Sequence, residues 1–131
     1  MTPRAALLLA ASAGVALGLA GCAKEPHPPQ TGGCYTVVFP KTKGGDYKFN
    51  LVKPSAPDLE HCAADLEVVR VEYLSNGGNR SDLWGVYQGH YIYINNAGLY
   101  SANSIDGMTY PLLVRTGDGR LARPGAVANP Q

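Results

Sequence analysis

The sequence predicts a small α+β fold: an antiparallel, meander-like β-sheet with one short helix, clipped together by a disulfide. Apolar and polar residues alternate over several short stretches that are separated by Gly- and Asn-rich turns, which is typical of antiparallel strands with one buried face. One stretch instead has apolar residues at helical spacing. The cysteine count is the third observation, and it predicts the disulfide.

The first two strands are predicted in CYTVVF (34–39) and DYKFNLV (46–52). In both stretches every second residue is aromatic or aliphatic, so each strand has one apolar face. The intervening PKTKGG is polar and ends in two glycines, which favours a turn. The two strands are therefore expected to form a hairpin.

A helix is predicted after the second strand. Ser55 and Asp58 fit the pattern S-x-x-D, a variant of the capping box, and Pro57 would lie in the first turn. The apolar residues that follow have the spacing i, i+3, i+4 and i+7: Leu59, Cys62, Ala63 and Leu66. This stripe is expected to turn Cys62 toward the interior of the protein.

The second half of the chain is predicted to consist of strands. In EVVRVEYL (67–74), apolar residues alternate with Arg70 and Glu72, which indicates a third strand. After a polar loop, LWGVYQGHYIYIN indicates two short strands that meet near Gln88–Gly89–His90. NNAG then predicts a turn, LYSA a continuation of the meander, and PLLVRTGDGRL a last strand with a Gly-rich turn.

The 131 residues predict one folded domain, at 34–122, with segments of different character on either side. Residues 1–21 contain a basic start and then sixteen uncharged, mostly small apolar residues, which predicts a secretory signal peptide. That run is shorter than the roughly 20 residues that a membrane span requires. Residues 22–33 are Pro- and Gly-rich and are expected to form a flexible tether. Residues 123–131 are expected to be a disordered tail.

The end of the predicted signal peptide carries a family resemblance. Leu19-Ala20-Gly21-Cys22 resembles the lipobox of bacterial lipoproteins. The resemblance implies cleavage before Cys22, a diacylglycerol on its sulfur, and attachment to the membrane through that lipid. The residue after Cys22 is Ala23 rather than Asp, which by the same resemblance implies the outer membrane, with the domain facing the periplasm.

The net charge and the cysteines limit the kinds of partner that the mature chain can have. Arg4 is the only charged residue before Cys22, so the formal net charge of +1 falls to zero after cleavage. A neutral chain has no basic field for nucleic acid, and no nucleic-acid partner is expected. Lipidation of Cys22 leaves Cys34 and Cys62, which are expected to form a disulfide in an oxidising compartment. It would close a loop of about 29 residues and contribute about 3–4 kcal/mol.

One group of aromatic residues is the candidate binding surface. Tyr91 and Tyr93 alternate with two isoleucines, so the tyrosines would form an outer face if the isoleucines fill the core. Aromatic faces of this kind bind partner proteins and stack on sugar rings. The sequence thus predicts a non-catalytic envelope protein that binds a partner protein or peptidoglycan. The predicted binding residues are Trp84, Tyr87, Tyr91 and Tyr93.

Two other functions compete with this prediction. The first alternative is a periplasmic inhibitor of lysozyme-type enzymes, a function that small β-rich lipoproteins with a disulfide also have. A metal-assisted enzyme is the third function, because His61 and Asp65 would share one face of the predicted helix with Asp58. No nucleophile elbow, phosphate loop or C-x-x-C motif occurs, and neither a cofactor nor catalysis is expected.

Overall fold

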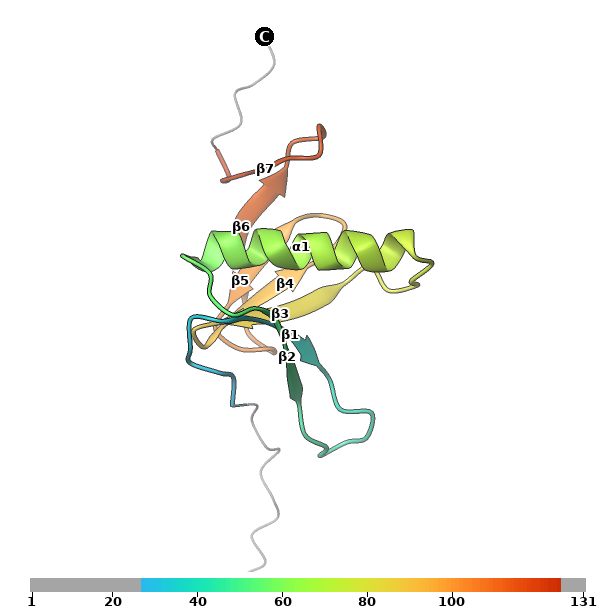
Figure 1. Cartoon of the computed structure of the whole chain (residues 1–131), viewed down its shortest axis with the longest axis vertical. Helices are drawn as coiled ribbons and strands as arrows, with labels where there is room; N and C mark the ends of the chain where they lie inside the picture. The colour runs from blue at the N-terminus through green and yellow to red at the C-terminus, as the bar shows by residue number, and fades with distance from the viewer. Residues whose placement is uncertain (1–26, 126–131) are drawn as a thin grey trace, which may run out of the picture.

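The computed structural model describes residues 27–125, in which one helix lies across a seven-stranded antiparallel open sheet (Figure 1). The predicted α+β class is confirmed. The strand order is β2-β1-β3-β4-β5-β6-β7, so β3 to β7 form a meander and the β1–β2 hairpin lies beside β3. The elements are β1 (Cys34–Val38), β2 (Lys48–Lys53), α1 (Leu59–Ser75), β3 (Leu83–Tyr87), β4 (His90–Ile94), β5 (Leu99–Ala102), β6 (Thr109–Arg115) and β7 (Leu121–Ala122).

Two tight turns hold the meander in register, and both lie where the sequence predicts them. Between β3 and β4, Gln88 and Gly89 have φ angles of 46° and 79°. Two successive positive φ angles are characteristic of a type I′ turn, whose twist matches that of the paired strands. Between β4 and β5, the side chain of Asn95 accepts hydrogen bonds from the N–H groups of Ala97 and Gly98.

Helix α1 is longer than predicted and includes a predicted strand. It continues to Ser75, so the prediction of a strand at 67–74 is wrong. Leu66 and Arg70 extend the stripe begun by Cys62, and all three side chains are buried against the sheet. Apolar residues also occur on the outer side of the helix, which is why this stretch satisfies a period of two as well as the helical period.

The start of the helix also differs from the prediction. Asp58 is itself the N-cap, and its Oδ1 accepts a hydrogen bond from the backbone N–H of His61 at 2.8 Å. Ser55 lies before the helix, so the predicted S-x-x-D capping box is wrong. An Asp at the N-cap satisfies one of the free N–H groups of the first turn and requires no second residue.

The sheet is apolar on both faces. Its helix side packs against α1, and Gly85 on β3 permits this close approach because a Cβ there would collide with Leu66. Ile92 and Ile94 are completely buried on the helix side, as predicted if the isoleucines fill the core. The other side of the sheet has a second, smaller cluster centred on Val37, Val86, Tyr91 and Ala102.

The predicted disulfide is confirmed: Cys34 on β1 is bonded to Cys62 on α1. Both residues are completely buried, and their Cα atoms are 5.4 Å apart. The bond therefore attaches the helix covalently to β1, the second strand from one edge of the sheet. Its sequence separation of 28 residues gives the stabilisation of about 3–4 kcal/mol that the chain-entropy model predicts.

The described chain begins within the predicted tether. The carbonyl of Pro29 accepts a hydrogen bond from Gly89, and the carbonyl of Gly32 accepts one from Ala56. The last residues before β1 thus lie against the domain. The predicted signal peptide and Cys22 lie outside the described residues. Within residues 27–125, no helix is long and apolar enough to cross a membrane.

Candidate functional site

A row of aromatic rings crosses the side of the sheet that α1 leaves uncovered. The register places Trp84, Tyr93 and Tyr100 directly opposite one another on β3, β4 and β5. The ring centroids of Trp84 and Tyr93 are 4.7 Å apart at an interplanar angle of 35°, and those of Tyr93 and Tyr100 are 6.4 Å apart at 32°. Phe39 and Tyr47 extend the row beyond Trp84 through edge contacts. We call these five residues the ring row.

The structure places the four predicted binding residues in different surroundings. Trp84 and Tyr93 belong to the ring row and are half-buried. Tyr91 is on the same side of the sheet but only 4% exposed. Tyr87 points to the helix side, where its hydroxyl donates a hydrogen bond of 2.7 Å to the carbonyl of Ala56. The alternation of side chains along β3 separates Tyr87 from Trp84.

A groove lies between the outer side of α1 and the β6–β7 hairpin. Its volume is about 960 Å³. Val68 and Val71 project into it from α1 and are 56% and 48% exposed. The remaining lining residues are Ala64, Glu67, Arg70 and Glu72 from α1, and Arg115, Gly117, Gly119, Arg120 and Leu121 from the hairpin. A cleft of this size with apolar walls and a few polar groups has the properties of a binding site.

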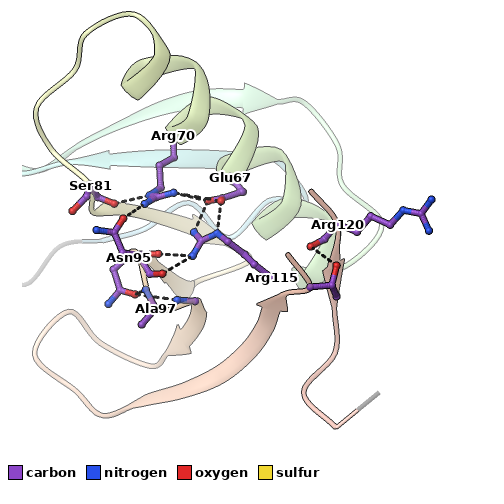
Figure 2. Close-up of polar contacts among 10 residues, drawn as sticks. Glu67, Arg70, Ser81, Asn95, Ala97, Arg115 and Arg120 are labelled. Carbon is purple, nitrogen blue, oxygen red and sulfur yellow. Dashed lines mark hydrogen bonds and ion pairs between the residues drawn. The ribbon is translucent and has the colours of Figure 1, made fainter. Parts of the chain in front are cut away.

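Three polar residues of the groove, Glu67, Arg70 and Arg115, form a network of hydrogen bonds and ion pairs (Figure 2). Arg115 binds both carboxylate oxygens of Glu67, with its Nε 2.7 Å from Oε1 and an Nη 3.0 Å from Oε2. Arg70 contacts the same carboxylate at 3.4 Å and donates to the carbonyl of Ser81 and the side chain of Asn96. Side-chain exposure is 13% for Glu67, 7% for Arg70 and 28% for Arg115.

This network has a structural consequence for the groove. Arg115 also donates to the backbone carbonyls of Asn95 and Asn96, so the network joins α1, the β4–β5 turn and β6. Within the described residues, every buried side-chain nitrogen and oxygen atom has a hydrogen-bond partner. Arg70 and Arg115 are therefore saturated by the protein, whereas Arg120 and Glu72 are exposed, so the groove offers a ligand apolar side chains and these two charged groups.

The candidate metal ligands do not come together. His61 pairs with Asp58 rather than Asp65: its Nδ1 is 2.7 Å from Oδ1 of Asp58, on an exposed surface. The N–H group and ring of His61 hold the pKa of Asp58 below its usual range. No cluster of three or more His, Cys, Asp or Glu residues suited to a metal ion occurs between residues 27 and 125.

Sequence reasoning missed the groove because it assigned Val68 and Val71 to a strand. The signal was present: Ala64, Val68 and Val71 have the spacing i, i+4 and i+7, which is a second apolar stripe on a helix. A helix with apolar residues on more than one side is typical of an element that is covered on more than one side.

Comparison with known proteins identifies no relative that could inform the interpretation of this site. No protein-family model, no curated protein and no solved structure matches this chain.

Proposed function

We propose that this chain is a lipid-anchored protein of the bacterial envelope whose domain binds a partner protein in the groove, without catalysis. The observation that carries the proposal is the second apolar stripe of α1. No described residue covers this stripe, and it borders a groove of about 960 Å³. Burying two exposed valines on a partner is favourable, because each contributes on the order of 1–2 kcal/mol when removed from water.

The position of the tether supports access to the groove. Pro29 accepts a hydrogen bond from Gly89 in the β3–β4 turn, at the end of the sheet where β5 ends and β6 begins. The groove is instead lined by Arg115, at the C-terminal end of β6. A lipid on Cys22 would place the tether end of the domain toward the membrane. The groove would then open on the other side, toward partners in the compartment.

The geometry of the ring row favours the groove over the aromatic face as the main site. The closest rings in the row turn their faces toward each other, so those faces are less available to a sugar ring or a partner. A role of the ring row in binding peptidoglycan or protein stays a prediction.

Site-specific crosslinking in the host envelope tests the binding proposal. A photo-crosslinking amino acid replaces Val68 in one variant and Leu51 in the control; both side chains are 56% exposed, but Leu51 lies on β2, at the opposite edge of the sheet. We expect a discrete protein adduct from position 68 only. The same adduct from both positions, or none from position 68, would contradict the groove. An adduct that a muramidase releases would assign peptidoglycan as the partner instead.

Lipid labelling tests the anchor separately. A fatty-acid analogue is expected to label the wild-type protein, which stays with the membrane fraction. Cys22→Ser is expected to lose both the label and the membrane association, because the sulfur that carries the diacylglycerol is gone. Equal labelling of the two proteins would exclude Cys22 as the lipidated residue.

A further inference from the structure

We infer that the groove takes an extended segment of its partner, which pairs with β7 as an additional strand and packs alternate apolar side chains against α1. This inference rests on the proposed function, since it names the kind of segment that the groove binds. The inference depends on two features of the protein, the free edge of β7 and the uncovered stripe of α1.

β7 presents main-chain groups to the groove. Thr116 donates its N–H to the carbonyl of Arg120 at 3.1 Å, so these two residues form a hydrogen-bonded pair of the hairpin. The next pair is Arg115 and Leu121. Because hydrogen-bonded and non-hydrogen-bonded pairs alternate in antiparallel strands, the N–H and C=O of Leu121 point away from β6. Among the described residues β7 is the last strand of the sheet, so this edge is available to a further strand, and Leu121 also lines the groove.

The uncovered stripe of α1 lies where such a strand would pack. The sheet contacts α1 through β1, β2, β3 and β6, and β7 is its last strand. One more strand beside β7 would carry the sheet over Val68 and Val71.

Two exposed arginines beside β7 indicate the other side chains of that segment. Arg120 lies in the turn of the hairpin and Arg123 follows β7; their side chains are 84% and 73% exposed, and the carboxylates paired with them, on Asp118 and Glu60, are 3.8 Å away. Such exposed, long pairs are weak. Side chains of an added strand alternate between α1 and solvent, so acidic residues at the outward positions would lie near these arginines. The expected segment therefore alternates apolar and acidic residues.

A helix is a poorer occupant of the same groove. It satisfies its own main-chain hydrogen bonds and would leave the N–H and C=O of Leu121 without a partner. An extended segment satisfies them and adds affinity through the main chain, as in β-strand addition. The chain's own residues 126–131 follow β7 and are a further candidate, which the experiment below distinguishes.

The test uses the chain from residue 22 onward, carrying Cys22→Ser, and NMR spectroscopy with three synthetic peptide mixtures. The first alternates valine or isoleucine with glutamate. The second has the same sequences with N-methyl groups on every second residue, which block pairing along one strand edge. The third has the same composition rearranged to helical periodicity. The readouts are the methyl signals of Val68 and Val71 and the hydrogen-exchange rate of the Leu121 amide.

We expect only the alternating peptides to shift both valines and to slow exchange of the Leu121 amide, by about tenfold at saturation. Val68→Lys is expected to abolish both effects, whereas the matched control Leu51→Lys retains them. Valine shifts without protection of Leu121, or stronger binding of the helical mixture, would overturn strand pairing while leaving the groove as a binding site. No shift with any peptide would overturn the inference, while crosslinking at position 68 decides the proposed function independently.

The chain's own C-terminus gives a different result. If residues 126–131 occupy the groove, the Leu121 amide is already protected in the free chain, and a chain that ends at Gly125 loses this protection. That outcome would overturn the partner strand as the occupant. Unchanged exchange of Leu121 in the shortened chain supports the inference.

Discussion

The groove and the ring row are both apolar surfaces of one small domain, but they differ in what their side chains contact. The rings pack against one another across three strands, with centroids as close as 4.7 Å. Val68 and Val71 instead project from α1 into open space and are about half exposed. The aromatic residues of the ring row therefore pack against the fold itself, whereas the aliphatic residues on the outer side of α1 remain about half exposed.

Their polar neighbours differ in the same way. At the groove, the charged groups of Glu67, Arg70 and Arg115 are saturated by one another and by backbone carbonyls. They hold the two walls in place without using the valines. The comparison teaches that exposed apolar area, and not aromatic content, distinguishes the surface that we propose for binding in this domain. It predicts that changes in the ring row alter stability and that changes in the groove alter binding.

Loss of the disulfide should have the largest effect on both surfaces together. In the double variant Cys34→Ala/Cys62→Ala, the free energy of unfolding measured in urea is expected to be about 3–4 kcal/mol lower, because the unfolded chain regains the entropy of an open loop. Since the bond attaches α1 to β1, the groove and the ring row should weaken in parallel. A variant that loses only one of the two surfaces would contradict a common scaffold.

Trp84→Ala should separate the two surfaces most clearly. Trp84 contacts Phe39, Tyr91 and Tyr93, so its removal leaves a hole in the middle of the ring row. We expect a loss of about 3 kcal/mol in the free energy of unfolding, at the lower end for large aromatic residues because Trp84 is only half-buried. In the same urea titration, Val68→Ala should lie within about 0.5 kcal/mol of the wild type. Equal losses would show that the valines also stabilise the fold.

Glu67→Gln tests whether the network holds the walls of the groove. The substitution leaves two arginines without their carboxylate, and the expected loss is about 2 kcal/mol, less than for a completely buried pair because Arg115 is 28% exposed. The NMR signals of Val68 should shift as the β6–β7 hairpin moves, while those of Tyr93 should not. Glu72→Gln, which removes an exposed carboxylate from the same groove, is the control and should leave both signals unchanged.

The sequence predicted the sheet better than it predicted the helix, and the reason is physical. Strand alternation in 83–94 has one explanation, because the Gln88–Gly89 turn fixes where the two strands meet. The stretch 67–74 is apolar at positions that fit both a strand and the outer side of a helix. Packing of Leu66 against Gly85 and burial of Arg70 decide for the helix, and neither contact can be read locally. The groove was missed with the helix, since its wall exists only when Val68 and Val71 are helical.

The smallest expected effect concerns the start of α1, which lies outside both surfaces. The hydrogen bonds from His61 lower the pKa of Asp58 from its usual value of 3.8, so the carboxylate stabilises the folded state above about pH 4 and this contribution is lost as the pH falls through the lowered pKa. Asn caps a helix about as well as Asp but does not titrate in this range. As the pH falls from 5 to 2, the free energy of unfolding should therefore decrease less for Asp58→Asn than for the wild type. This is roughly the pH range in which an Asp with a lowered pKa loses its stabilising charge.

Urea titrations at a series of pH values measure this difference. Binding of the alternating peptides at pH 7 should be the same for Asp58→Asn and the wild type, because the groove begins at Ala64, beyond the first turn of the helix. Identical acid dependence of the two proteins would mean that the Asp58 carboxylate has no part in holding α1. A weaker groove in Asp58→Asn would mean that the cap, and not only the network around Glu67, positions Val68 and Val71.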